Sequence, residues 1–237
     1  ALAVLLALAP GALAEGPLRV YVGTYTDGAG SKGIYTFTLD PATGKPSEPV
    51  AAGEAKNPSF LAISPNGKFL YSADELYGPP TGITAGMVTA FAIAPKEGTL
   101  SKLGSEASGG NGPCHLTVDA TGRNLLVAHY GSGSVALVPI DADGKLGRLA
   151  ELIKHAGKSV NPRRQESPHC HSVNLDPANR YAYVPDLGLD QVRCYHLLPD
   201  QHRLMPNEPG MTAIEPGSGP RHFAFHPDGK HAYVISE

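Results

Sequence analysis

The chain has 237 residues, and its 19 Lys and Arg against 22 Asp and Glu give a formal net charge of −3. Hydrophobic residues make up 41% of the chain, which is enough apolar material for a folded core and excludes a disordered protein. The nearly balanced charge excludes a basic surface of the kind that binds nucleic acid or an anionic membrane.

The N-terminal segment has the features of the end of a secretory signal peptide. The first eight residues are wholly apolar, Pro10-Gly11 interrupts the run, and Ala12-Leu13-Ala14 is the small-residue pattern of a cleavage site. The run is too short to span a bilayer, and the alternative of a buried N-terminal helix is disfavoured by Pro10. We expect a truncated signal peptide at residues 1–14, a mature domain at residues 15–237, and export to the periplasm or the medium.

A repeat of two short apolar stretches joined by a turn recurs four times. The clearest copy begins at Pro58, turns at Asn66-Gly67 and ends at Tyr71. Further copies begin at Pro113, Pro168 and Pro220, so that the leading prolines are 55, 55 and 52 residues apart. Asn-Gly and Asp-Gly dipeptides favour a tight β-hairpin, because both residues accept a positive φ. Each copy therefore predicts a hairpin.

Further strand-like stretches lie between the copies. Each is either continuously apolar or alternates between apolar and polar residues, and each is followed by a turn. These stretches occupy residues 33–40, 87–93, 134–140 and 191–197. No part of residues 15–237 shows the sustained 3.6-residue period of an amphipathic helix. About four strands in roughly 50 residues is the spacing of a propeller blade. We predict an all-β fold, a β-propeller.

The order of the strands predicts an open arrangement. Residues 18–25 match the second strand of a blade, counted outward from the central channel, and residues 231–237 are again a second strand. A closed four-bladed ring that begins on a second strand would end on a first strand. The chain is therefore predicted to cover about four blades plus one strand. Because it also lacks an initial Met and stops within an apolar run, we expect a piece of a longer protein.

Polar residues are expected to gather at one mouth of the channel, because the start of a first strand lies beside the end of the second. At the strand starts stand Phe60, His115, His169, His171, Arg221 and His222, and at the strand ends stand Asp74, Glu75, His129, Tyr130, Asp186, Leu187, Ser236 and Glu237. His169 and His171 are two apart on a predicted strand and would share a face. For His115 and His222, hydrogen bonding between neighbouring blades is an open alternative.

The arginines add a cationic component to this predicted site. Arg221 follows Pro220, and a guanidinium suits a carboxylate, a phosphate or a developing oxyanion. Arg164 lies in a predicted loop, and the alternative to a functional role is that this loop is simply exposed to solvent. The sequence has no G-x-S-x-G elbow, P-loop, H-E-x-x-H or dinucleotide fingerprint. The lack of a nucleophile motif favours chemistry in which a base activates water, and no cofactor is predicted.

The cysteines leave two alternatives open. Cys114, Cys170 and Cys194 allow one disulfide at most, and Cys194 has the character of a small buried hydrophobe. The first two, together with His115, His169 and His171, could bind a soft metal. The loop spacing of a dedicated zinc site is absent, so we predict no metal.

Four segments carry a resemblance to a known family. They are Tyr21-Val22-Gly23-Thr24-Tyr25-Thr26, residues 164–171 around Pro168-His169-Cys170-His171, residues 183–190 around Asp186-Leu187-Gly188-Leu189-Asp190, and Gly219-Pro220-Arg221-His222. They resemble the lactonase family of seven-bladed β-propellers, which includes cycloisomerase-type 6-phosphogluconolactonases and a fungal carboxymuconate cyclase. The resemblance covers residues 17–237. It implies seven blades in the complete protein and a cleft at the channel mouth.

The resemblance also implies an activity and its residues. His169, His171, Arg221 and Glu237 are the implied catalytic residues, with Arg164 and Glu75 behind them. Together with His115 and His222 from the channel mouth, Arg164 and Glu75 are the predicted substrate-binding residues. The implied reaction opens a sugar δ-lactone to the aldonic acid, with Glu237 or His171 drawing a proton from water and Arg221 stabilising the oxyanion or holding an anionic group. No nucleic-acid partner and no membrane span are expected.

Two alternatives to hydrolysis remain. A phosphorylated pentose-phosphate intermediate is a cytosolic substrate, whereas residues 1–14 predict export. An exported relative could hydrolyse another lactone or be a non-catalytic propeller that binds a ligand or a protein. A lactone-forming, muconate-type cycloisomerase of the same fold is the other alternative.

Overall fold

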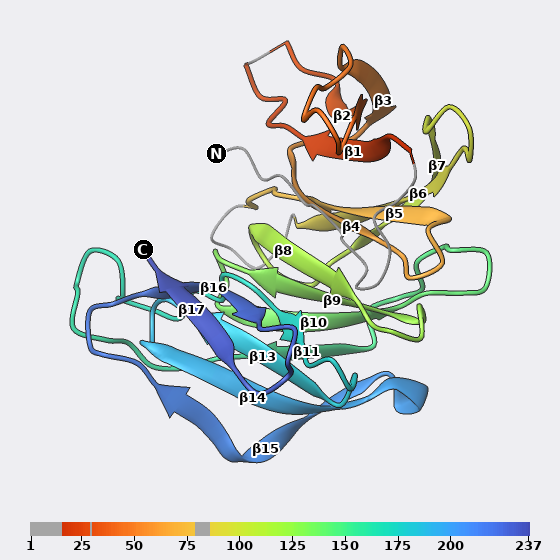
Figure 1. The fold of residues 1–237 in the computed structure, drawn as a ribbon. Helices are drawn as coiled ribbons and strands as arrows, with labels where there is room; N and C mark the ends of the chain where they lie inside the picture. The colour runs from red at the N-terminus through yellow and green to blue at the C-terminus, as the bar shows by residue number, and fades with distance from the viewer. Residues whose placement is uncertain (1–15, 29, 79–85) are drawn as a thin grey trace.

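Short antiparallel strands joined by turns form nearly all of the regular structure in the computed structural model (Figure 1). The structure describes residues 16–28, 30–78 and 86–237, so the predicted signal peptide lies outside the described residues. No helix in these ranges is long and apolar enough to cross a lipid bilayer. The elements, in chain order, are β1 (Leu18–Gly23), β2 (Gly33–Leu39), β3 (Val50–Glu54), β4 (Pro58–Ile63), β5 (Phe69–Asp74), β6 (Met87–Ile93), β7 (Leu100–Ala107), β8 (Pro113–Val118), β9 (Asn124–His129), β10 (Ser134–Pro139), β11 (Glu151–Lys154), β12 (Asn174–Leu175), β13 (Tyr181–Asp186), β14 (Gln191–Leu198), η1 (Pro199–Gln201), β15 (Arg203–Ala213), β16 (Pro220–Phe225) and β17 (Ala232–Ser236).

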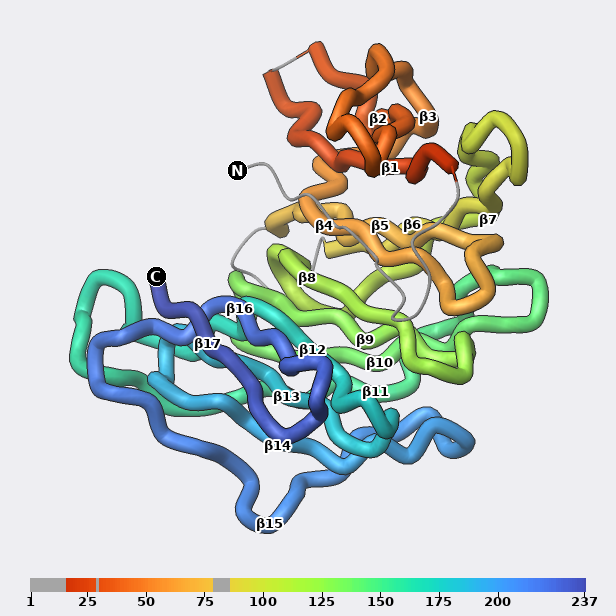
Figure 2. The backbone as a smooth tube through the Cα atoms, viewed as in Figure 1, coloured from red at the N-terminus to blue at the C-terminus, as the bar shows by residue number. Residues whose placement is uncertain are grey.

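The strands form five sheets in which sequential strands are neighbours. β1–β3 form a three-stranded sheet, β4–β7, β8–β11 and β12–β15 form four-stranded sheets, and β16–β17 form a hairpin. Figures 1 and 2 show the sheets following one another along an arc, from the red β1–β3 to the blue β16–β17. The predicted partial β-propeller is confirmed, including a chain that starts and stops on a second strand.

One predicted strand is much shorter than expected. The copy that begins at Pro168 contributes only β12, preceded by an isolated bridge between Cys170 and Asp186. The opposite strand β13 carries Pro185, which accepts the His171 N–H at 3.1 Å but has no N–H to return. Because a proline removes a ladder hydrogen bond, pairing is lost there. His169 and His171 therefore lie in an irregular segment, and the prediction that they occupy a regular strand is wrong.

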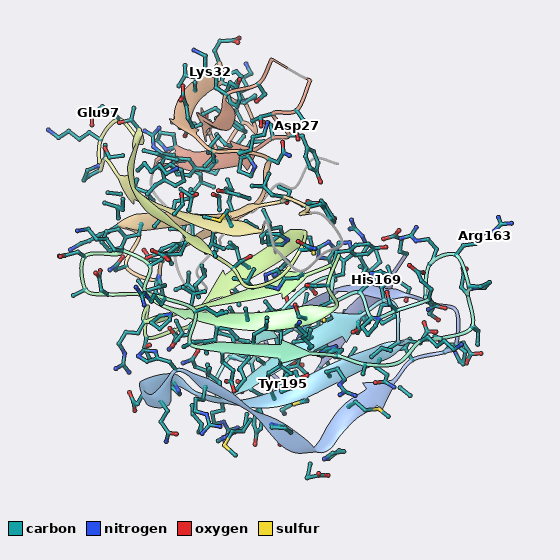
Figure 3. The ribbon with its side chains drawn as sticks, turned by 180° about the vertical axis from the view of Figure 1, so that it is seen from behind. Asp27, Lys32, Glu97, Arg163, His169 and Tyr195 are labelled. Carbon is teal, nitrogen blue, oxygen red and sulfur yellow. The ribbon has the colours of Figure 1, made fainter. Side chains whose placement is uncertain are left out.

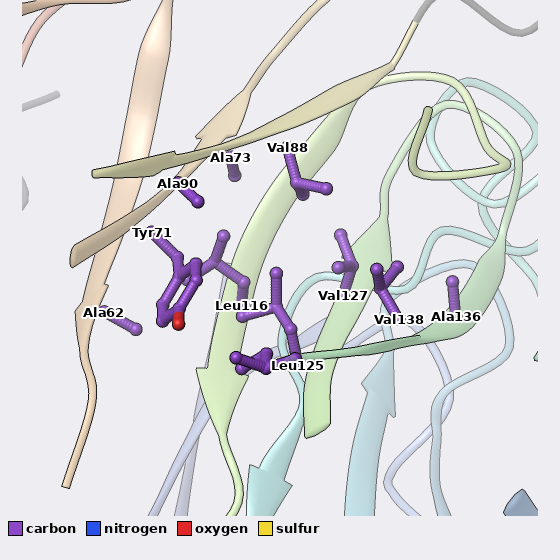
Figure 4. Packing of buried hydrophobic residues seen from close by; sticks show 11 residues of the cluster. Ala62, Tyr71, Ala73, Val88, Ala90, Leu116, Leu125, Val127, Ala136 and Val138 are labelled. Carbon is purple, nitrogen blue, oxygen red and sulfur yellow. The ribbon is translucent and has the colours of Figure 1, made fainter. Parts of the chain in front are cut away.

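The apolar core is divided among the boundaries between successive sheets. One cluster joins β4–β6 to β8–β10 and includes Tyr71, Val88, Leu116 and Leu125 (Figure 4). The fully buried Tyr71 donates its hydroxyl hydrogen to the Gly144 carbonyl at 3.2 Å, in the turn of the next blade. Burial of each large side chain is worth about 1.5–3 kcal/mol. These boundaries fix the angle between blades and hence the relative positions of their inner strand ends.

Candidate active site

A cavity of about 390 Å³ lies at the ends of the inner hairpins β4–β5, β8–β9 and β16–β17. Its lining residues are Tyr25, Ser59, Phe60, Glu75, Tyr77, Cys114, Tyr130, Arg164, His171, Arg221, His222 and Glu237. Six of the eight predicted site residues are among them, namely Glu75, Arg164, His171, Arg221, His222 and Glu237. The other two, His115 and His169, lie outside this lining.

A recurring β-bulge directs one side chain per hairpin into the cavity. The strand register shifts between Pro58 and Phe60 in β4, and at the equivalent places in β8 and β16. The skipped residues are Ser59, Cys114 and Arg221, and all three line the cavity. Bulges commonly re-aim side chains beside functional sites. The sequence shows the repeated proline but not the bulge that follows it.

The residues just after the second strands occupy one structural position. The backbone N–H groups of Glu75, Tyr130 and Glu237 each donate to the carbonyl of the residue before a leading proline, at 2.9, 2.9 and 3.0 Å. The expectation that Glu75 and Glu237 share a register is therefore confirmed. The same bond brings Tyr130 to the cavity between them.

Glu237 joins two arginines from different segments. Arg164 Nη2 donates to Glu237 Oε1, and Arg221 Nε donates to Glu237 Oε2 at 3.0 Å. Arg164 Nη2 also donates to the Tyr130 hydroxyl oxygen at 3.2 Å. Burial of Glu237 by itself would raise its pKa, but the Arg164 hydrogen bond and the charges of both arginines outweigh that effect and lower the pKa. Glu237 therefore holds the two guanidinium groups and is a weak base.

Glu75 is held differently, by two tyrosines. The hydroxyl of Tyr25 donates to Glu75 Oε2 at 2.8 Å, and that of Tyr77 donates to Oε1 at 3.3 Å. Burial first, and then the hydrogen bond or charge of Glu75, raise the pKa of both phenols, so both remain protonated donors. Neither tyrosine was predicted as a site residue. The position of Tyr25, two residues beyond β1, was the available signal in the sequence.

The histidines form a chain of rings along one wall. The ring centroids of His171 and His222 are 5.2 Å apart, and those of His222 and His115 are 5.9 Å apart. Burial, followed by the charge of Arg221, lowers the pKa of His171 to about 4, and the same causes lower that of His222. Burial lowers the pKa of His115 to about 3. These imidazoles are therefore neutral at pH 7.

His171 presents an unusual ring nitrogen. Its Nδ1 is buried and has no hydrogen-bond partner among the described residues. His115 differs, because its Nδ1 accepts the backbone N–H of Val173 at 3.3 Å and its ring packs against Phe60. This contact between blades fits the structural alternative that the sequence left open for His115.

His169 lies behind the cavity wall. Its ring stacks on Tyr130 with a centroid distance of 4.4 Å, and its Nδ1 bonds to the Tyr130 carbonyl at 2.9 Å. Its Nε2 lies 3.5 Å from the Glu166 carboxylate. Figure 3 shows His169 at the base of the loop from which Arg163 projects into solvent. The contacts of His169 position Tyr130, and a direct catalytic role for His169 remains a prediction.

The Asp186–Asp190 turn connects the segments that carry the site residues. Asp186 Oδ1 accepts the His169 N–H at 2.8 Å. Asp190 Oδ2 accepts the Ser159 hydroxyl at 2.5 Å and the Gly217 N–H at 2.7 Å, while Oδ1 accepts the Gly219 N–H at 2.8 Å. The turn thus fixes both the loop before Arg164 and the loop before Arg221.

We expect Asp190→Asn to lower kcat/KM by about tenfold to a hundredfold for the reaction at this site. The new amide NH₂ could point a donor at the Gly217 N–H, which is itself a donor, so the loop before Arg221 would shift. A misplacement of about 1 Å in a catalytic group lowers the rate by up to about a hundredfold. Asp143→Asn, at an exposed turn, is the matched control. If Asp190 acts through Arg221, its substitution costs less when Arg221 is already alanine. An equal loss in both backgrounds would contradict this role.

A buried cluster beneath the site is internally satisfied. His155 Nδ1 bonds to Asp186 Oδ2 at 2.6 Å, and His155 Nε2 bonds to the Tyr195 hydroxyl at 2.7 Å (Figure 3 labels Tyr195). Both ring nitrogens are therefore occupied, although Cys170 Sγ is only 3.3 Å from Nδ1. The three cysteines are free thiols, and burial raises the pKa of Cys114 to about 12. The cluster braces the wall, and the ligand atoms of His155, Cys170 and Asp186 lie within 4.8 Å of one another.

Comparison with known proteins identifies similar chains. Residues 19–237 match a family model described as lactonase, 7-bladed beta-propeller. A 6-phosphogluconolactonase of Bacillus subtilis is 39% identical over 92% of this chain and 59% of its own length. A 6-phosphogluconolactonase of Formosa agariphila is 32% identical over 92% of this chain and 61% of its own length.

A solved structure shows the same likeness in three dimensions. The periplasmic gluconolactonase of Pseudomonas aeruginosa superposes with a TM-score of 0.86 at 34% identity, covering 94% of this chain and 62% of that protein. The chain therefore spans about three fifths of the length of the relatives it matches.

Proposed function

The chain belongs to the lactonase family of seven-bladed β-propellers, and from that premise we propose that it hydrolyses a sugar δ-lactone to the aldonic acid in the cavity at the strand ends. The observation that carries the proposal is the pairing of Arg164 and Arg221 on Glu237 beside the neutral His171. Fixed cations next to a neutral imidazole suit the addition of water to a carbonyl, where negative charge develops on oxygen.

We assign the catalytic roles from the hydrogen bonds that each group already makes. Both oxygens of Glu237 already accept hydrogen bonds from arginines, so neither is free to accept a proton from water. We assign proton removal from water to His171 and stabilisation of the oxyanion to Arg221, supported by Arg164. When the ring C–O bond breaks, the proton held on His171 passes to the leaving alkoxide, and the acid then ionises.

The remaining lining residues suit a sugar. Glu75 with its two phenols presents a carboxylate acceptor and two hydroxyl groups on one side of the cavity. His222 adds a neutral imidazole on another. Polar groups of this kind orient sugar hydroxyls by hydrogen bonding.

A pH-stat assay on glucono-δ-lactone and on its 6-phosphate tests the proposal, because hydrolysis releases a proton in both cases. Faster proton release than in buffer alone supports it, and the ratio of the two rates distinguishes a pentose-phosphate substrate from a neutral lactone. Inertness towards both would reject the proposal. In that case, conversion of cis,cis-muconate would indicate a cycloisomerase, and inertness there too would favour a ligand-binding propeller.

We also propose that the protein is exported, on the signal-peptide pattern of residues 1–14. Fractionation of cells that express the protein with its natural N-terminus tests this, because an exported protein appears in the periplasm or the medium. Retention with cytoplasmic markers would reject export and would favour a phosphorylated substrate.

We expect kcat/KM, corrected for spontaneous hydrolysis, to be flat from pH 5.5 to 7.5. His171 has a pKa of about 4 and stays in its basic form throughout this range, whereas an unperturbed histidine with a pKa of about 6.5 would lose nearly tenfold. His171→Gln should lower kcat by about 10²–10⁴-fold. A tenfold fall between pH 7.5 and 5.5 in folded enzyme, or normal turnover by the variant, would remove His171 from this role.

A further inference from the structure

The turn between β16 and β17 places two imidazoles and a carboxylate together on the surface (Figure 1 shows the hairpin). His226 Nδ1 lies 3.0 Å from Asp228 Oδ1, and His231 Nδ1 lies 2.8 Å from Asp228 Oδ2. The ligand atoms of all three residues lie within 4.8 Å of one another, and all three residues are exposed. This cluster has no part in the cavity, whose lining comes from the opposite ends of these strands.

The fold itself does not require this set of side chains. The equivalent turn of β4–β5 has Ser64, Asn66 and Phe69 at the same positions, and it closes with the same backbone bonds. There Asn66 Oδ1 accepts the Lys68 N–H at 3.0 Å, as Asp228 Oδ1 accepts the Lys230 N–H at 2.8 Å. Ser64 also takes part in that turn, since its Oγ accepts the Phe69 N–H at 3.0 Å, and His226 Nδ1 likewise accepts the Asp228 N–H at 3.2 Å. A neutral serine and a neutral amide are therefore enough to close the turn. The imidazole of His231 and the negative charge of Asp228 are additional to what folding needs.

The carboxylate is fixed before any ligand arrives. Asp228 Oδ1 accepts backbone N–H groups from Lys230 and from His231, the latter at 3.3 Å. Asp228 is therefore held in place between the two imidazoles.

We propose that His226, Asp228 and His231 form a surface site for a divalent transition-metal ion of the zinc type. Two imidazole nitrogens and one carboxylate oxygen are donors that such ions prefer, whereas calcium and magnesium favour all-oxygen sets. Binding replaces the ring proton that an imidazole now shares with Asp228, and that proton is released to solvent. Three protein ligands leave further coordination positions for water.

The expected consequence of binding is local. The metal would join the last residue before the turn to the first residue after it, and so would hold the outer ends of β16 and β17 together. A strand rises roughly 3.3 Å per residue, so the six-residue β16 places this site roughly 20 Å from the cavity. The site therefore stabilises the hairpin and takes no part in the reaction.

Titration calorimetry with Zn²⁺ on the metal-stripped, full-length protein tests the proposal. The turn of β4–β5 supplies replacements that preserve folding, so the variant is His226→Ser with His231→Phe. We expect the wild type to bind one more equivalent of Zn²⁺ than this variant, and Asp228→Asn to bind that equivalent about tenfold or more weakly. His196→Phe, outside the cluster, is the control and should bind as the wild type does.

A second measurement is needed because Zn²⁺ can also bind other histidines of the chain. Zn²⁺ should raise the melting temperature of the wild type, because it binds the folded turn better than the unfolded chain. It should raise that of the double variant by less. Equal stoichiometry and equal thermal shifts in the two proteins would overturn the proposal.

Discussion

Replacing Arg221 with alanine is expected to lower kcat/KM for lactone hydrolysis by about 10²–10³-fold, since that is the usual cost of removing one donor to a developing oxyanion. Arg221 lies at a β-bulge, lines the cavity and is held by Glu237 at 3.0 Å. The loss should fall mainly on kcat, because the charge on the lactone oxygen exists only in the transition state. Initial rates in a pH-stat give both parameters.

Two further variants make the result specific. Arg163→Ala removes the same charge from an exposed neighbour of Arg164 that points into solvent (Figure 3), and it should leave the rate unchanged. Arg221→Lys keeps the charge but loses the planar fork, so an intermediate rate is expected. A normal kcat in Arg221→Ala would exclude this guanidinium from the chemistry.

The second large effect concerns acid stability. Burial lowers the pKa of His115 to about 3 and that of His129 to about 4, against about 6.5 in an unfolded chain. Between pH 6.5 and these values the unfolded state binds more protons, so the free energy of unfolding falls as the pH falls. At pH 5 each of these two histidines should cost about 2 kcal/mol relative to pH 7.5.

Urea unfolding at pH 7.5 and at pH 5 measures this effect. His115→Phe removes one of the two titrating groups and introduces the residue that the β4 hairpin has at the same position, Phe60. The variant should lose about 2 kcal/mol less than the wild type over this pH range. His196→Phe, which lies outside the buried wall, should follow the wild type. Identical pH dependence in His115→Phe would show that His115 is not buried as a neutral group.

The strand order was predictable because it depends on local patterns. Apolar runs of six to eight residues, separated by Asn-Gly, Asp-Gly and similar turns, define the strands. The repeat then fixes which strands are inner and outer. It also predicts the common position of Glu75 and Glu237, because the spacing from each leading proline is nearly constant.

The parts that could not be predicted depend on contacts between distant residues. Tyr25, in the segment after β1, bonds to Glu75 from 50 residues away, and no local pattern joins the two. Likewise, the bonds of Asp190 to Gly217 and Gly219 cross between blades. The lost strand before β12 follows from one proline in the partner strand, whose effect depends on pairing that the sequence alone does not show.

The bulge at the start of the inner strands also bears on how this cavity could change. Serine, cysteine and arginine occupy the bulged position in different blades, on closely similar backbones closed by the same hydrogen bond. The hairpin therefore tolerates a small hydroxyl, a thiol or a long cation there. A substitution at residue 59, 114 or 221 would alter the chemistry offered to a ligand while the surrounding ladder persists. Natural selection, or a mutant library confined to these three positions, can therefore change ligand specificity with little effect on folding.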